Sequence, residues 1–144
     1  MNSIQCDIMS IDCLIFSKKI KQITAIGTEG ELGVLSGHTP FITQLNSGPL
    51  IITHINNKKE IFYLDGGLIE VESNMISCLS YSIIKANEIN EYELTKNINE
   101  AKVLIKEKSS TINYTRAIAD ISLAHSRLRT LKQFKTTLTN NAYH

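Results

Sequence analysis

A change of hydrophobic period near residue 86 limits what this chain can fold into more than any other feature. Residues 1–85 consist of short segments in which apolar and polar side chains alternate, the pattern of β-strands with one buried face. Residues 88–138 contain neither glycine nor proline, and their apolar residues recur every three or four positions, the pattern of amphipathic helices. The sequence therefore predicts a β domain followed by a helical domain, an α+β fold.

Turn sequences divide the N-terminal half at short intervals. They are Ser47-Gly48-Pro49, Asn56-Asn57, Asp65-Gly66-Gly67 and Ser73-Asn74. In the segment after the third turn, Ile69 and Val71 share one face, opposite to Leu68 and Glu70. Many short strands with regular turns are typical of an antiparallel sandwich or barrel. We expect an antiparallel β-sandwich over residues 1–86.

The C-terminal half carries two apolar stripes separated by a polar run. The first stripe consists of Leu94, Ile98, Ala101 and Ile105, and the second of Tyr114, Ala117, Ile121, Ala124, Leu128 and Leu131. Asn90 and Glu93 form a capping pair at the start of the first stripe. We expect two helices of about 20 residues each. Joined by the polar run KEKSST, they form an antiparallel hairpin, a regulatory domain over residues 87–144 with a disordered C-terminal tail.

Both stripes are narrow and rich in alanine, so each helix buries little apolar area. The hairpin is therefore expected to pack on the sandwich, on a partner, or on each in turn. Its second helix is also basic, because Asp120 is the only acid between Arg116 and the C-terminus. The basic residues are Arg116, Arg127, Arg129, Lys132 and Lys135. Such a face could contact an acidic partner or nucleic acid, or it could be merely solvated.

The glycine-rich stretch GTEGELGVLSGHTP raises the question of a phosphate-binding loop. Such a loop needs GxxxxGK[ST] leading into a helix. This stretch has no lysine, contains two glutamates that would repel phosphate, and precedes the strand-like run FITQL. We expect instead a structured surface loop that Leu32, Val34 and Leu35 anchor to the core. Glu29 and Glu31 then point outward.

The titratable residues give no sign of catalysis. None of the four histidines lies at catalytic or metal-ligand spacing from a Cys, an Asp or a second His. The scattered Cys6, Cys13 and Cys78 fit reduced, buried thiols. A net charge of +1 argues against nucleic-acid binding, and no apolar run approaches the roughly 20 residues of a membrane helix. We expect no catalytic residue, no metal, no cofactor and no direct membrane insertion.

Three stretches of the chain resemble one protein family. The run EGELGVLSGHTPFITQLNSGPLII is similar to the signature of the epsilon subunits of F-type ATP synthases, called delta in mitochondria. The run FYLDGGLIEVESNMISCLS resembles a strand pair of that family, and YTRAIADISLAHSRLRTL resembles its second C-terminal helix. The resemblance covers nearly the whole chain in the right order and spacing.

The resemblance implies a ten-stranded β-sandwich followed by a two-helix hairpin, in a non-catalytic rotor subunit of the central stalk. Such a subunit couples proton flow through the membrane ring to ATP synthesis from ADP and phosphate, and it can restrain ATP hydrolysis through its helices. The implied partners are the gamma subunit, the rotor ring of c subunits and, through the C-terminal helices, the alpha/beta catalytic head. The implied location is the cytoplasmic face of the bacterial inner membrane, as a peripheral membrane protein.

The resemblance also implies three sets of contact residues. They are Glu29, Glu31, Leu32 and Gly33 for the rotor ring, His38 and Thr39 for the gamma subunit, and Arg116, Arg127 and Arg129 for an inhibitory contact with the beta subunit. Exposed basic side chains on a weakly docked helix can exchange water for carboxylates, and salt weakens that attraction.

Two positions depart from the pattern of the family. The usual proline before Gly37 is Ser36 here, which loosens one turn. Some bacterial members bind ATP through the motif [IL]-D-x-x-R-A, whose Asp and Arg correspond to Asn90 and Glu93. Because a carboxylate then replaces a phosphate-binding guanidinium, we expect this chain not to bind ATP.

Two other classes of protein remain open from the residues alone. One is a free-standing β-sandwich that binds a small molecule or a sugar and carries a helical oligomerisation tail, although the chain has no tryptophan for an aromatic-lined site. The other is an enzyme, for which no constellation of catalytic residues is evident. Association with a gamma subunit would separate the rotor-stalk hypothesis from both.

Overall fold

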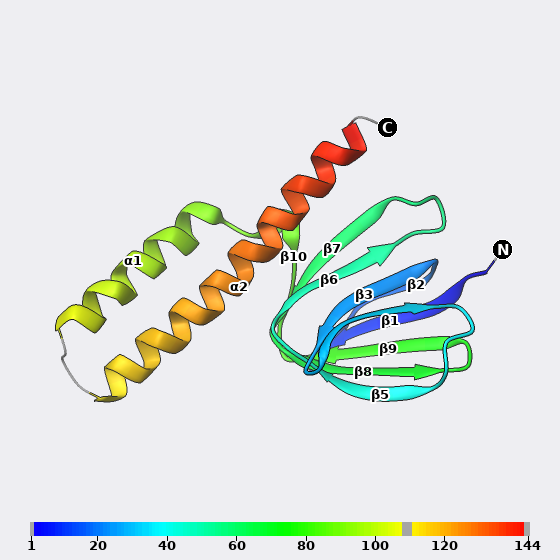
Figure 1. Cartoon of the computed structure of the whole chain (residues 1–144), viewed down its shortest axis with the longest axis horizontal. Coiled ribbons are helices and arrows are strands. Elements are labelled where there is room, and N and C mark those ends of the chain that lie inside the picture. Colours follow the sequence, from blue (N-terminus) through cyan, green and yellow to red (C-terminus); the bar gives the residue numbers. More distant parts are fainter. Residues whose placement is uncertain (1, 108–110, 143–144) are drawn as a thin grey trace.

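The structure is a computed structural model that describes residues 2–107 and 111–142. A β-sandwich lies beside a pair of helices (Figure 1). The strands are β1 (Ile4–Ser10), β2 (Leu14–Ile20), β3 (Gln22–Gly27), β4 (Gly30–Leu35), β5 (Phe41–Leu45), β6 (Gly48–Thr53), β7 (Lys59–Leu64), β8 (Gly67–Glu72), β9 (Met75–Ser80) and β10 (Ile83–Lys85). The helices are the short 3-10 helix η1 (Ala86–Glu88), α1 (Glu91–Glu107) and α2 (Thr111–Ala142). The predicted fold class is confirmed.

Hydrogen bonds link the strands in the order β10-β7-β6-β3-β5-β8-β9-β1-β2, with β4 paired to β3. The two ends of this path face each other, because Phe16 on β2 packs against Phe62 on β7 with 6.0 Å between their ring centroids. Among the described strands, β1 and β9 run parallel and the other pairs are antiparallel. β1 also pairs antiparallel with β2, so the predicted antiparallel sandwich is confirmed with one exception, the parallel β1–β9 pair.

Along the strands, side chains point alternately into the core of the sandwich and away from it. On β8, Ile69 and Val71 are buried inside the sandwich, whereas Leu68 and Glu70 are exposed. The faces predicted for this strand are confirmed.

The cysteines do not share one environment. Cys6 and Cys78 are buried in the core, but Cys13 is exposed. It lies in the turn between β1 and β2, where its backbone N–H donates to the hydroxyl of Ser10 at 3.2 Å. The prediction of buried thiols was therefore wrong for Cys13, because a turn between two strands offers no apolar cover.

The glycine-rich stretch closes the β3–β4 hairpin and forms strand β4, and only its last residues, 36–40, are a loop. β4 pairs with β3 and places Val34 opposite Ile23. Val34 is buried and Leu32 packs against the core, as expected. Leu35 is 49% exposed, so its predicted anchoring role was wrong. It follows the inward-facing Val34 and therefore points to the other face of the strand.

The start of α1 agrees with its predicted cap. The backbone N–H of Glu93 donates to the side-chain Oδ1 of Asn90 at 3.1 Å. Behind this cap, Leu94 and Ile98 pack against Ala124 of α2. The two predicted stripes therefore meet in the hairpin.

Helix α2 is longer than its sequence pattern predicted. It has 32 residues, against about 20 expected from its stripe. No glycine or proline interrupts it, and its segment beyond the end of the stripe remains helical. Where a disordered tail was expected, the chain is therefore helical as far as Ala142. Residues 143–144 lie outside the described residues.

Helix α2 lies along β6 and β7 of the sandwich (Figure 1). On β7, Phe62 and Leu64 face the core, so Ile61 and Tyr63 face outward. Those outward residues are nevertheless only 3% and 0% exposed, because α2 covers their side of the strand. The hairpin therefore packs on the sandwich, which is one of the outcomes that its narrow stripes predicted.

Candidate interaction surfaces

The turn between β3 and β4 holds Glu29, one of the residues expected to contact the rotor ring, and the others follow on β4. Gly27 pairs with Gly30 across a tight turn, in which Gly30 has a φ of 126°. A Cβ atom on Gly27 would lie 3.0 Å from Cδ2 of Leu32, so only glycine lets Leu32 pack over the turn. The backbone N–H of Thr28 donates to the carbonyl of Gln44 at 3.2 Å. The turn is therefore fixed to the neighbouring strand β5.

Four residues of this hairpin form the set expected at the ring. Glu29, Glu31 and Gly33 are exposed, and Leu32 is partly buried. Glu31 also lines a pocket of about 40 Å³ that Gln133 of α2 helps to form. The structure thus gathers the set at the tip of the β3–β4 hairpin, where Glu31 lies close to the long helix, and we call the tip with Glu29 and Glu31 the acidic turn.

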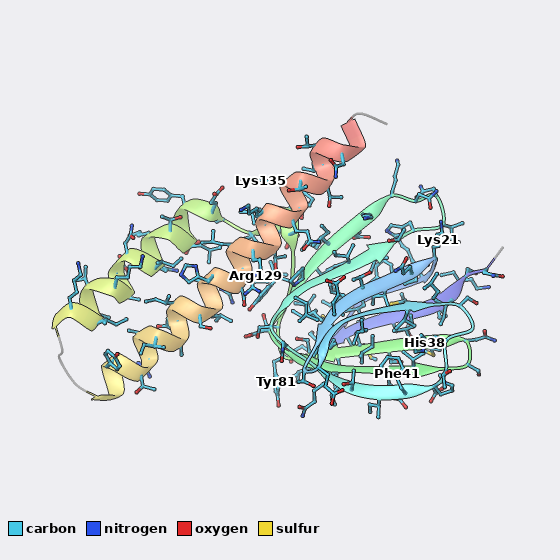
Figure 2. All side chains as sticks on the ribbon, viewed as in Figure 1. Lys21, His38, Phe41, Tyr81, Arg129 and Lys135 are labelled. Atoms are coloured by element: carbon cyan, nitrogen blue, oxygen red, sulfur yellow. The ribbon has the colours of Figure 1, made fainter. Side chains whose placement is uncertain are left out.

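The residues expected at the gamma subunit lie in the loop between β4 and β5. The backbone N–H of His38 donates to the carbonyl of Leu35 at 3.2 Å, and Gly37 adopts a φ of 83°. His38 Nδ1 lies 2.7 Å from the carbonyl oxygen of Thr39, and its ring centroid lies 5.0 Å from that of Phe41. Figure 2 shows His38 and Phe41 close together on the sandwich, well away from the labelled residues of α2.

The acidic turn and the His38 loop are separate surfaces. β4 joins them and has six residues, so it spans about 20 Å. A surface of this length leaves room for two different contacts side by side.

The three arginines expected to form the inhibitory contact do not share one environment. Arg116 and Arg129 are exposed, whereas Arg127 is partly buried. The guanidinium carbon of Arg127 lies 5.4 Å from the centroid of the Tyr63 ring. The sequence placed all three arginines toward a partner, but the docked hairpin turns Arg127 toward its own sandwich.

A groove at the start of α1 is lined by the two residues that replace the Asp and Arg of the ATP-binding motif. It has a volume of about 210 Å³, and Asn90 and Glu93 line it together with Glu88 and Arg127. Two carboxylates beside a single guanidinium make this groove unfavourable for a polyphosphate. The groove therefore supports the expectation that the chain does not bind ATP.

Sequence reasoning missed an exposed apolar patch on β8 and β9. Leu68 lies opposite Leu79, and both point away from the core. With Ile11 and Tyr81 they line a pocket of about 260 Å³, and we call these four residues the outer apolar patch. Exposed apolar groups that cluster in this way mark protein contacts. The sequence did hold a signal, because Leu79 follows the inward-facing Cys78 and so falls on the face that should be polar.

Two further classes of site were sought in the described chain. Within residues 2–107 and 111–142, no three His, Cys, Asp or Glu side chains come together in a way that could hold a metal ion. In the same residues, no helix combines the length and the apolar character needed to cross a membrane.

Taken together, the fold and these surfaces define a class of protein: a β-sandwich docking protein that carries a helical hairpin. A family model described as ATP synthase, Delta/Epsilon chain, beta-sandwich domain matches residues 3–86. The chain therefore belongs to the ATP synthase delta/epsilon chain family.

Relatives in this family extend over both domains. The chain is 36% identical to the ATP synthase epsilon chain of Chromohalobacter salexigens over 135 residues, which cover 94% of this chain and 96% of that one. It is 31% identical to the ATP synthase epsilon chain of Psychrobacter arcticus, with 94% of this chain and 98% of that one covered. The similarity to epsilon chains thus includes the hairpin.

Solved structures share the fold at lower identity. A chain in the Euglena gracilis mitochondrial ATP synthase structure of OSCP, F1 and c-ring superimposes with a TM-score of 0.72 at 22% identity, covering 94% of this chain and 81% of that one. A chain in the central stalk and c-ring structure of the Tetrahymena thermophila mitochondrial ATP synthase gives 0.59 at 15% identity, covering 89% and 96%. At these identities the likeness supports the fold alone.

Proposed function

We propose that this chain is the epsilon subunit of an F-type, proton-driven ATP synthase. In that role it is a non-catalytic part of the central stalk, and it helps to couple proton flow through the membrane ring to ATP synthesis from ADP and phosphate in the catalytic head. The observation that carries the proposal is the identity with curated epsilon chains at 31–36% over 94% of the chain. A free-standing binding module would have no reason to retain both domains of that family.

The proposed partners follow the separate surfaces of the sandwich. The acidic turn with Glu29 and Glu31 contacts polar loops of the rotor ring. The His38 loop, with Thr39, contacts the gamma subunit, and the outer apolar patch extends that contact. Through these partners the chain sits at the cytoplasmic face of the inner membrane as a peripheral subunit.

A regulatory role of the hairpin is part of the proposal. Arg116 and Arg129 are exposed on α2 and free of the sandwich surface that holds Arg127. Cationic side chains in such positions can pair with an acidic segment of the beta subunit. We infer that the hairpin restrains ATP hydrolysis when it leaves the sandwich and extends toward the catalytic head.

The test of the stalk assignment is co-purification with the gamma subunit of the same complex. The unaltered chain should co-purify with gamma, and Leu79→Asp should weaken the association at least tenfold, because it places a charge in an apolar contact. Val103→Asp is the matched control, since Val103 on α1 is similarly exposed at 53%. The assignment fails if the unaltered chain does not bind gamma. If Leu79→Asp and Val103→Asp bind gamma equally well, only the proposed role of the outer apolar patch is contradicted.

A further inference from the structure

Tyr63 and Arg127 meet where the hairpin docks on the sandwich. Tyr63 lies on the outward face of β7 and is fully buried beneath α2. The guanidinium carbon of Arg127 lies 5.4 Å from the centroid of the tyrosine ring. A cation at this distance is attracted to an aromatic ring, and more strongly where water is excluded. The contact therefore favours the docked hairpin.

The same two side chains also carry polar atoms that the docked state leaves without hydrogen bonds. Among the described residues, the Tyr63 hydroxyl and Arg127 Nε are the buried side-chain polar atoms that make no well-formed hydrogen bond. Ser47 and Arg127 lie close enough to the hydroxyl to lower its pKa, but not in the geometry of a full hydrogen bond. A buried polar group without a partner costs free energy that hydration would restore. The contact is therefore attractive through the ring and unfavourable through the two polar atoms.

We propose that Tyr63 and Arg127 form a releasable latch that sets the fraction of molecules in which the helical hairpin is docked on the sandwich. Release hydrates the hydroxyl and the guanidinium together, which offsets part of the attraction lost. The latch therefore holds the hairpin without fixing it permanently.

Two residues near Arg127 on α2 contribute little to the contact between the helix and the sandwich. Ser126 and Thr130 are buried but small, and the Thr130 hydroxyl donates to the Ser126 carbonyl of the same helix at 3.0 Å. Neither residue brings a large apolar side chain to the contact with the sandwich. The Thr130 hydroxyl is also bonded within the helix rather than to the sandwich. On this part of α2 the larger side chains that are withdrawn from solvent include those of Arg127 and of the buried Leu131.

The environment of Tyr63 keeps its ring uncharged. Burial raises the pKa of the Tyr63 hydroxyl and the nearby Asp65 carboxylate adds to the increase, while Ser47 and Arg127 oppose it. The phenol therefore stays protonated at neutral pH, and Arg127 meets the face of a neutral ring rather than an anion. Such an attraction yields more readily to a carboxylate than a buried ion pair would.

The latch gives Arg127 two alternative positions. While the hairpin is docked, its guanidinium lies over Tyr63 and is withdrawn from any partner. Once the hairpin is released, the guanidinium can pair with a carboxylate on another protein. Only this last step rests on the proposed function, since the latch itself is a property of the isolated chain.

The latch can be measured on the isolated, full-length chain by the reactivity of a thiol placed under α2. Ile61→Cys, in a Cys13→Ser background, puts that thiol on the covered face of β7, and a thiol reagent then reports how often the hairpin leaves. Cys6 and Cys78 provide an internal reference for global unfolding. Both lie in the core, where burial raises the pKa of Cys6 to about 12 and that of Cys78 well above its usual value.

Two variants separate the attraction from the penalty. Tyr63→Phe keeps the ring but removes the unpartnered hydroxyl, so it should slow labelling at position 61 about tenfold. Arg127→Met keeps an apolar stem but removes the cation together with its unpartnered Nε. Because a latch that holds the hairpin requires the attraction to the ring to exceed the cost of burying Nε, this variant should speed labelling about fivefold. Arg129→Met, on the exposed side of the same helix, should leave the rate unchanged.

Three results would overturn the latch. The first is a labelling rate that Tyr63→Phe leaves unchanged or increases. The second is a rate that Arg127→Met does not increase, or that Arg129→Met increases equally. The third is a thiol at position 61 that reacts no faster than Cys6 and Cys78. Because no partner subunit is present, none of these results depends on whether the chain binds gamma.

Discussion

At the scale of single residues, Gly67 is the most tightly constrained position described. It opens β8 with a φ of 148°, in the region that favours glycine. A Cβ atom at this position would clash with the backbone carbonyl oxygen of Leu79 on the neighbouring strand. No other residue fits unless β8 and β9 move apart, which would disturb the two strands that carry the outer apolar patch.

We therefore expect Gly67→Ala to lower the free energy of unfolding by about 3 kcal/mol or more, since it combines overpacking with backbone strain. Urea denaturation of the isolated chain measures the change. Gly33→Ala is the matched control, because its Cβ atom would meet only the end of the Gln22 side chain, at 3.2 Å. Its effect should stay within about 1 kcal/mol. Equal losses in the two variants would contradict the steric argument.

Residue environments on α2 show where prediction from the sequence stops. Arg116, Arg127 and Arg129 are equivalent in a sequence pattern, and all three were expected to face a partner. Which of them faces the sandwich depends on the rotation of α2 about its axis. That rotation is set by packing against α1 and against β7, which are remote in sequence, so the position of Arg127 over Tyr63 could not be predicted.

At the scale of elements, local signals were sufficient where the determining interaction is local. The Asn90 cap predicted the start of α1, because its hydrogen bond spans only three residues. β2 and β4 carry only a weak local signal, because their alternation is masked. β2 exposes Lys18 and Lys19 at the edge of the sheet, and β4 contains glycines and an exposed glutamate. Such strands are defined by the neighbours with which they pair, and those neighbours are not visible in the pattern of the strand itself.

The first turn of α1 carries a prediction about nucleotides. With Glu93 in place of an arginine, isothermal calorimetry of the isolated chain with magnesium and ATP should give no binding heat at submillimolar concentration. The double variant Asn90→Asp and Glu93→Arg restores the Asp and the Arg of the ATP-binding motif beside Arg127, with Leu94 still in place of its alanine, and it should gain measurable affinity. A micromolar dissociation constant for the unaltered chain would contradict the prediction.

At the scale of the whole molecule, the sandwich and the hairpin differ in how they are held. The sandwich has a continuous core of its own. The hairpin has a small one, formed mainly by Leu94, Ile98 and Ala124, and it relies on the sandwich for additional cover. Separation of the two parts is therefore easier than unfolding of the sandwich, which is what a movable regulatory element requires.

Truncation after Ala86 tests the regulatory role in the assembled complex. It should raise ATP hydrolysis by the complex and leave assembly intact, because the surfaces proposed for gamma and the ring lie on the sandwich. Removal of α2 also uncovers Tyr63, so circular dichroism and co-purification with gamma must first show that the sandwich is folded. An unchanged rate of hydrolysis in a correctly assembled complex would mean that the helices are only a scaffold.

A full-length control avoids exposing the face under α2. The double variant Arg116→Gln and Arg129→Gln removes the two exposed arginines of the proposed contact and keeps the hairpin. It should raise ATP hydrolysis by a smaller amount than truncation does. At high salt the difference in hydrolysis between this variant and the unaltered complex should shrink, because screening weakens ionic contacts.

The parallel pairing of β1 with β9 has a consequence for synthesis of the chain. Gln5 and Met75 are neighbours in the sheet although 70 positions separate them in sequence. While the ribosome makes the chain, the first strand must therefore wait, unpaired on that edge, until almost the whole sandwich has emerged. Contacts of such long range slow folding and prolong exposure of strand edges. Until Ser80 has emerged from the ribosome, this edge of β1 therefore stays open to pairing with other chains.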